Sequence, residues 1–418
     1  MTYSRKLSDR IKSYYRISLP RRTYFLIIIT VFTFLTWLLA LPLFGPLSLG
    51  FLVSVKALAM EKGRAVQLFL ATMIISSLLS GFLVDKLKKN FVFIYLSTLL
   101  CSGISVSIIF LSRISDYFLV YLALGFLAGL SPAAVGAFLA EKVSPEDRGR
   151  VLSIPVGASI AVAYLFLLND PPVLTKEQGV LIMSIILACS LSTILLRVKT
   201  VEEVKPSKSK KSADLKTIMF YSVPIFLFYW TAGILFSIVF PTLLDHISKN
   251  VFYLVWAIPF LVGSLIGGIL LDTLGRRIPM MIGLAIMGIA LAIFGIWGID
   301  VGVVFILPLS IGFSFVALTS LIIWGDLAPA QSRGLYYGAG VGVIALAILL
   351  GLFATGSVFG STGINQVKSY LFFSSIALFL AIPPLIFVEE ILPKELVDKR
   401  KLQEYLELAK KKYIDRSS

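Results

Sequence analysis

Apolar segments long enough to cross a lipid bilayer follow one another along the whole chain. A membrane-spanning helix needs about 20 predominantly apolar residues, and the sequence contains twelve segments of roughly that length, six on either side of a polar stretch. Hydrophobic residues make up 58% of the chain and charged residues only 15%, whereas soluble domains are about half apolar and a quarter charged. The sequence therefore predicts an all-α membrane protein with twelve transmembrane helices in two six-helix halves.

The polar stretch and the two chain ends divide the sequence into five parts. The stretch is rich in Lys and Ser and poor in apolar residues, a composition typical of a linker. We expect a basic, amphipathic cytoplasmic segment over 1–22, a first half over 23–196, a cytoplasmic linker over 197–216, a second half over 217–389, and a cytoplasmic helix or tail over 390–418.

Positive charge is distributed unevenly between the two sides of this predicted bundle. Most of the 38 Lys and Arg residues fall in the chain ends, the linker and the other loops on the same side. The exceptions are Lys56, Lys62, Arg64, Arg113, Lys176, Lys249 and Lys368. Because cytoplasmic segments carry an excess of Lys and Arg, both termini are predicted to be cytoplasmic, in a protein of the cell membrane. This orientation and the attraction of anionic lipid explain the net charge of +15, so we expect no nucleic-acid partner.

One short motif, a glycine with an aspartate four residues later and then clustered basic residues, is written twice. In the first copy the glycine and aspartate are Gly81 and Asp85, and in the second they are Gly268 and Asp272. Each copy ends an apolar segment. The second copy continues with Gly275, Arg276 and Arg277.

An acid and an arginine seven residues apart follow each copy of the motif after two further apolar segments. They are Glu141 and Arg148 in the first half, and Asp326 and Arg333 in the second. The two halves therefore look like one membrane unit written twice.

The acids of these motifs lie where predicted helices meet the cytoplasm. An acid there can accept hydrogen bonds from the N-terminus of a neighbouring helix, whose dipole favours negative charge, or it can pair with an arginine. An exposed ion pair stabilises a folded protein by only about 0–1 kcal/mol. A network buried between the halves, and broken when they separate, could instead decide which conformation dominates, because a gap of a few kcal/mol is enough. We interpret the motif residues as a gate.

These features together resemble the major facilitator superfamily of secondary transporters. The resemblance covers nearly the whole chain: twelve spans, a basic central linker and the loop motif of the superfamily in both halves. The first copy departs from the family pattern, with Lys88 in place of the glycine and Asn90 at a usually basic position. The acid–arginine pairs look like the intracellular salt-bridge motif of the sugar-porter branch. The predicted seventh span, however, lacks the amide side chains with which that branch binds hydroxyl groups.

The resemblance implies transport by alternating access, with a solute bound near the middle of the bilayer between the two halves. It also implies that polar and aromatic residues of the first, seventh and tenth spans line the cavity. The candidate substrate-binding residues are Thr33, Thr36, Trp37, Tyr229, Trp230, Thr231, Thr319 and Ser320.

The middle of every predicted span is free of Asp, Glu, Lys, Arg and His. Charges at that depth are costly and are usually retained for function, so we expect a neutral or largely apolar solute. Two cysteines in apolar segments and a single histidine provide no metal site, and we expect no metal or cofactor. We also expect a monomer in the lipid bilayer, with a proton or sodium ion left open as a coupling ion.

Two other functions stay open from the sequence. A protein that kept this architecture but lost transport could act as a sensor or scaffold, and the altered first motif is compatible with this. A membrane-embedded enzyme acting on lipids would need catalytic acid and histidine sets near the membrane surface, and the composition disfavours it because the chain has one histidine.

Overall fold

The structure, a computed structural model, describes most of both halves of the chain. The described residues are 24, 27–32, 59–87, 90–107, 114–165, 214–298, 302–355 and 364–392. The predicted cytoplasmic segment 1–22 lies outside them, as do most of the linker 197–216 and of the tail 390–418. The first and sixth predicted spans also lie mostly outside the described residues.

All the described elements are helices. Those of the first half are α4 (Ala59–Leu87), α5 (Asn90–Ser107), α6 (Ile114–Lys142), the 3₁₀ turn η3 (Pro145–Asp147) and α7 (Arg148–Leu165). Those of the second half are α9 (Leu215–Ile234), the π-helical turn η4 (Leu235–Val239), α10 (Phe240–His246), α11 (Lys249–Thr273), α12 (Arg277–Trp297), α13 (Gly302–Leu327), α14 (Arg333–Ala354), α15 (Ile364–Leu380) and α16 (Ile382–Phe387).

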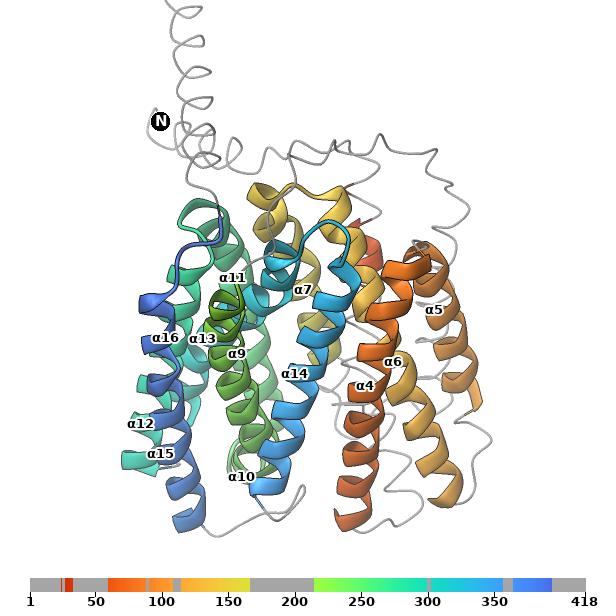
Figure 1. The fold of residues 1–418 in the computed structure, drawn as a ribbon. Helices are drawn as coiled ribbons and strands as arrows, with labels where there is room; N and C mark the ends of the chain where they lie inside the picture. Colours follow the sequence, from red (N-terminus) through yellow and green to blue (C-terminus); the bar gives the residue numbers. More distant parts are fainter. Residues whose placement is uncertain are drawn as a thin grey trace, which may run out of the picture.

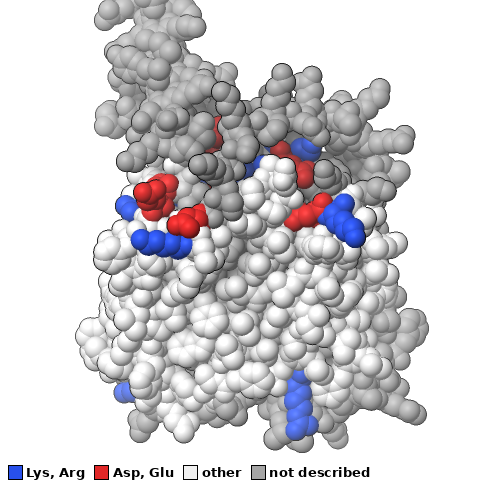
Figure 2. Space-filling model, viewed as in Figure 1, with Lys and Arg blue, Asp and Glu red and all other residues white. Residues whose placement is uncertain are grey.

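Eight helical stretches in the described ranges are long and apolar enough to cross a membrane. They run side by side as a bundle (Figure 1). Figure 2 shows charged side chains gathered near the two ends of the bundle, with an uncharged band between them on the visible face. Length, composition and this distribution together describe a multi-pass membrane protein, and the predicted all-helical membrane fold is confirmed.

Two helices deviate from regular α geometry at points that proline explains. Between α9 and α10 the chain makes a π turn, in which the Phe240 amide donates to the Leu235 carbonyl, just before Pro241, which has no amide hydrogen to donate. The pair Pro383–Pro384 at the start of α16 likewise separates α16 from α15 at Ala381. Each of the two pairs still forms one apolar stretch, Leu215–Leu244 and Gln366–Phe387, which is why the sequence predicts one span for each.

The two halves are joined by two long helix pairs, α4 with α14 and α7 with α11. In Figure 1 the first pair is the orange and blue helices that run beside each other through the bundle. Glycine permits the close approach: a Cβ on Gly81 would lie 2.7 Å from the Gly334 carbonyl oxygen, and one on Gly268 would lie 2.6 Å from the Gly149 carbonyl oxygen. Such small-residue contacts let membrane helices pack backbone to backbone.

We expect Gly81→Ala to destabilise the joint between α4 and α14, because the new methyl group would meet backbone that cannot move without shifting the whole helix. Overpacking of this kind costs about 1–3 kcal/mol, measured as a lower thermal unfolding temperature of the purified protein. The matched control is Gly103→Ala in α5, where a Cβ would have no neighbour within 4 Å. Equal unfolding temperatures for the two variants would contradict the close approach.

Candidate functional site

Six charged residues are buried together where the end of α11 meets the start of α7. Each is at most 5% exposed. This group, called the charge cluster below, consists of Asp147, Arg148, Arg150, Asp272, Arg276 and Asp326. It holds three acids and three arginines, so its formal charges cancel.

Asp272, near the end of α11, caps the first turn of α7 in the other half of the protein. Its Oδ1 accepts the Gly149 amide at 2.8 Å and its Oδ2 accepts the Arg150 amide at 2.9 Å. The first amides of a helix have no partner within the helix, and the positive end of the helix dipole favours a carboxylate. The side chain is 0% exposed, so the start of α7 depends on this residue for its hydrogen bonds.

Asp85, near the end of α4, makes the corresponding contact with the start of α14. Its carboxylate accepts the Gly334 amide at 2.7 Å and the Leu335 amide at 2.8 Å. Each copy of the doubled motif therefore caps a helix of the opposite half. Asp85 is only half-buried, and Lys88 and Lys89 beside it lie outside the described residues.

Arg276 connects Asp272 to the other acid of the second half. Its Nε lies 2.6 Å from Asp326 Oδ2 and its Nη1 lies 3.3 Å from Asp272 Oδ1. It also donates to the carbonyls of Leu271 (2.7 Å) and Pro145, the latter in the first half. Burial alone would lower the pKa of Arg276, but the neighbouring carboxylates of Asp326 and Asp272 outweigh it and raise the pKa above its ordinary value. The arginine is therefore charged whenever this contact is formed.

Two arginines of the first half complete the cluster. Arg148 forms an ion pair with Asp326 across the two halves and donates to the Ala140 carbonyl at 2.8 Å. Arg150 contacts Asp272 through Nε at 3.1 Å and also pairs with Asp147. Removing one partner from a buried pair typically costs 3–5 kcal/mol, because it leaves the other charge uncompensated. The cluster can thus act as a discrete contact that is either fully made or broken.

Glu390, which follows the last helix, holds the loop that presents Arg276. Its carboxylate accepts the Arg276 amide at 2.8 Å and the Arg277 amide at 3.0 Å, at the start of α12. Gly275 has a φ of 91°, a left-handed conformation that suits glycine, and the Glu390 carboxylate packs against it. The Arg277 guanidinium donates to the Val388 carbonyl at 3.0 Å.

Glu141 and Arg333 lie near the charge cluster and are more exposed than its members. The electrostatic field at Arg333 includes contributions from Arg148 and Glu141, so the residues share one neighbourhood. The Nε of Arg333 has no hydrogen-bond partner among the described residues, and Glu141 is exposed. The same motif written twice therefore has different surroundings in the two halves.

The predicted substrate-binding residues are only partly brought together. Thr33, Thr36 and Trp37 lie outside the described residues. Tyr229 of α9 and Ser320 of α13 meet, with their hydroxyl oxygens 2.9 Å apart. Thr319 donates to the Phe315 carbonyl of its own helix at 2.7 Å, and the buried hydroxyl of Thr231 has no partner among the described residues.

Aromatic side chains adjoin the pair of hydroxyl groups. The Phe228 ring lies 4.7 Å from the Tyr229 ring and 4.8 Å from the Phe313 ring, measured between centroids, and Phe313 lies 5.6 Å from Trp256 in the same way. Tyr229 and Ser320 thus place a polar pair beside a large apolar surface, an arrangement that suits a ligand with both kinds of surface.

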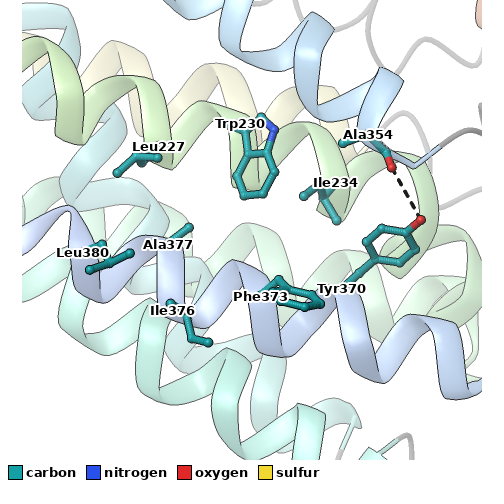
Figure 3. A pocket seen from close by; sticks show the side chains of 9 residues that line it. All are labelled: Leu227, Trp230, Ile234, Ala354, Tyr370, Phe373, Ile376, Ala377 and Leu380. Carbon is teal, nitrogen blue, oxygen red and sulfur yellow. Dashed lines mark hydrogen bonds between the residues drawn. The ribbon is translucent and has the colours of Figure 1, made fainter.

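Trp230 points elsewhere. It lines a groove between α9 and α15 (Figure 3), whereas Tyr229 contacts Ser320 of α13. Within the described residues no group of three or more His, Cys, Asp or Glu could hold a metal ion.

Sequence reasoning missed three residues of the charged end: Asp147, Arg150 and Glu390. Arg150 and Asp147 flank Arg148, so the clustering of acids and arginines around that residue was the available signal. Glu390 is separated from Arg276 by more than a hundred residues, and an acid just after the last apolar segment was its only sign.

Comparisons with known proteins establish the fold. No family model matches the sequence, and no curated protein matches it. The structure is similar to that of the human organic anion transporter MFSD10 (TETRAN), with 15% identity, a TM-score of 0.69, and coverage of 88% of this chain and 100% of that one. It is also similar to the major facilitator superfamily proton:xylose symporter XylE bound to 6-bromo-6-deoxy-D-glucose, with 11% identity, a TM-score of 0.68, and coverage of 88% and 96%.

We expect Glu390→Ala to lower the unfolding temperature, because the start of α12 would lose its carboxylate cap. Loss of such a cap costs about 1 kcal/mol. The matched control is Glu389→Ala, since Glu389 is exposed and surface substitutions usually change stability by less than about 0.5 kcal/mol. Thermal unfolding of the purified variants measures both, and indistinguishable variants would refute the capping role.

Proposed function

We propose that this chain, which has the major facilitator superfamily fold, is a transporter that moves a small, uncharged organic solute across a membrane by alternating access. The observation that carries the proposal is the reciprocal capping of helix starts between the two halves, by Asp272 on α7 and by Asp85 on α14. Both contacts lie at the end of the bundle that holds the charge cluster, and both must break if the halves separate there.

The charge cluster supports a gate that switches between two states. With Arg148 and Arg276 both on Asp326, the closed state has its buried charges paired. Opening would expose these groups to water, which replaces the lost contacts. The difference in free energy between the closed and open states can therefore be a few kcal/mol. In that range a bound solute can change which state is more populated. The predicted loops on the side of the charge cluster hold the excess of Lys and Arg, which is typical of the cytoplasmic side. The proposed gate therefore faces the cytoplasm. Both termini lie on the same side, and the membrane is the cell membrane.

The chemistry of the interior supports an uncharged solute. In the described spans, acidic and basic residues lie near helix ends, so no arginine or lysine there could neutralise an anion at mid-depth. The two similar structures are those of an organic anion transporter and a proton:xylose symporter. The Tyr229–Ser320 pair and its aromatic neighbours favour a hydroxyl-bearing, partly apolar molecule, carried as a monomeric uniporter or with a coupling ion.

Solute counterflow in proteoliposomes tests the proposal directly. A thermal-shift screen of sugars, polyols, amino acids and hydrophobic compounds selects the solutes to be loaded. Saturable exchange of one class supports transport. Absence of exchange across the whole panel would instead favour a sensor or scaffold that retains the fold.

We expect Asp272→Asn to slow transport more than it weakens solute binding. We also expect it to open the end of the bundle that holds the charge cluster. The amide would place a donor against Arg150 and Arg276. The reporter is a thiol introduced by Ser153→Cys, in a background without Cys101 and Cys189, because Ser153 is 0% exposed. Its alkylation by a water-soluble reagent should accelerate about tenfold or more, corresponding to loss of at least about 1.4 kcal/mol from the closed state.

Asp85→Asn is the matched comparison for this experiment. Asp85 makes the same two backbone contacts without the buried arginines described for Asp272, so its substitution should accelerate alkylation less. Equal, unchanged alkylation in both variants would refute the gate.

We expect Tyr229→Phe to raise the half-saturating solute concentration several-fold with the protein still folded, since one hydrogen bond is worth about 1 kcal/mol. Trp230→Phe is the neighbouring control, because Trp230 lies in the groove between α9 and α15. Both are measured by initial transport rates over a range of solute concentrations. A larger effect from Trp230→Phe would place the solute elsewhere.

A further inference from the structure

An apolar groove follows the outside of the bundle between α9 and α15. It has a volume of about 460 Å³. Figure 3 shows the side chains of both helices pointing into it along its length, with the last residue of α14 at one end. The lining residues are Leu227, Trp230, Ile234, Ala354, Tyr370, Phe373, Ile376, Ala377 and Leu380.

The groove opens toward the bilayer. Phe373 and Leu380, which line it, are each 62% exposed, and they lie within the span Gln366–Phe387. Exposed apolar side chains on a membrane span face lipid, so the groove opens on hydrocarbon rather than water.

The dimensions of the groove match one leaflet. From Tyr370 to Leu380 the wall extends roughly 15 Å at 1.5 Å per residue, about half of the roughly 30 Å hydrocarbon core. The groove runs along the direction of α9 and α15. A volume of about 460 Å³ along this length leaves room for one extended hydrocarbon chain.

One end of the groove carries a hydrogen bond between two of its lining residues. The Tyr370 hydroxyl donates to the Ala354 carbonyl at 3.5 Å, at the end of α14 farthest from Arg333 and the charge cluster. The other lining groups are apolar apart from the indole N–H of Trp230. A hydroxyl-rich solute would find almost no partners here.

We propose that this groove binds one acyl chain of a bilayer phospholipid, from the leaflet opposite the charge cluster. The acyl chain enters the groove beside Tyr370 and runs along Trp230 toward Leu227 and Leu380. An empty groove would leave its walls without dispersion contacts. The acyl chain gains no hydrophobic free energy on leaving the bilayer for the groove. Its binding therefore depends on packing and is reversible.

Fluorescence quenching tests the proposal, because Trp230 lies in the groove and Trp297, which is 61% exposed, lies on α12 outside it. Two variants of the full chain keep only one of these tryptophans, with the others replaced by phenylalanine. Each is titrated in micelles with phosphatidylcholine brominated on one acyl chain. We expect saturable quenching of Trp230 at low lipid fraction and quenching of Trp297 only in proportion to the lipid fraction.

Substitutions in the groove provide the second arm. Ala377→Phe fills the groove and should abolish the saturable phase, and Phe373→Ala, which removes one wall, should weaken it about tenfold. Phe372→Ala is the matched control, since Phe372 is 55% exposed and does not line the groove. Native mass spectrometry of the chain with all its tryptophans should show one phospholipid fewer on Ala377→Phe than on Phe372→Ala.

Three results would overturn the proposal. The first is proportional quenching at both tryptophans. The second is an unchanged lipid count in Ala377→Phe. The third is a change in the monomer–dimer balance on filling the groove, which would make this face an interface between copies of the chain.

Discussion

The structure depends on helix starts that cannot satisfy their own amides. At the first turns of α7 and α14 the free N–H groups each receive a carboxylate from the other half, Asp272 in a buried contact and Asp85 in a more exposed one. Glycine at these helix ends lets the carboxylates reach the backbone. Neither helix start is complete without the opposite half, so the association of the two halves at this end is a hydrogen-bonding requirement as well as a packing one.

The two copies of the motif solve this requirement with different chemistry. Asp272 shares its carboxylate between backbone amides and two arginines, all buried, whereas the described partners of Asp85 are two backbone amides. Buried ion pairs add little net stability compared with apolar packing, yet breaking one side of them is costly. The second copy therefore favours an all-or-none contact, and the first copy a softer one. Under the proposed function, opening would begin more easily between α4 and α14.

The sequence predicted the helical membrane fold and placed both motifs at helix ends, because apolar length and the recurrence of a spacing are visible in one dimension. The sequence did not reveal which residues the motif side chains contact. Arg148 and Arg150 are two positions apart, which on a regular helix would put them on different faces, but the start of α7 is enclosed and both point inward to acids. Glu390 reaches Arg276 from a distant part of the chain. Tyr229 and Trp230 looked like one site, and adjacency in sequence concealed that they diverge.

That divergence gives α9 two distinct faces at one depth. Successive residues of an α-helix are separated by about 100°, so Tyr229 meets Ser320 of α13 while Trp230 lies in the groove against α15. A solute held at Tyr229 and an acyl chain packed on Trp230 would contact the same turn of the helix. Any rotation or shift of α9 that changes one contact must change the other, because the two side chains share a rigid backbone. The composition of the surrounding bilayer would then influence solute affinity through α9, without any lipid entering the path of the solute.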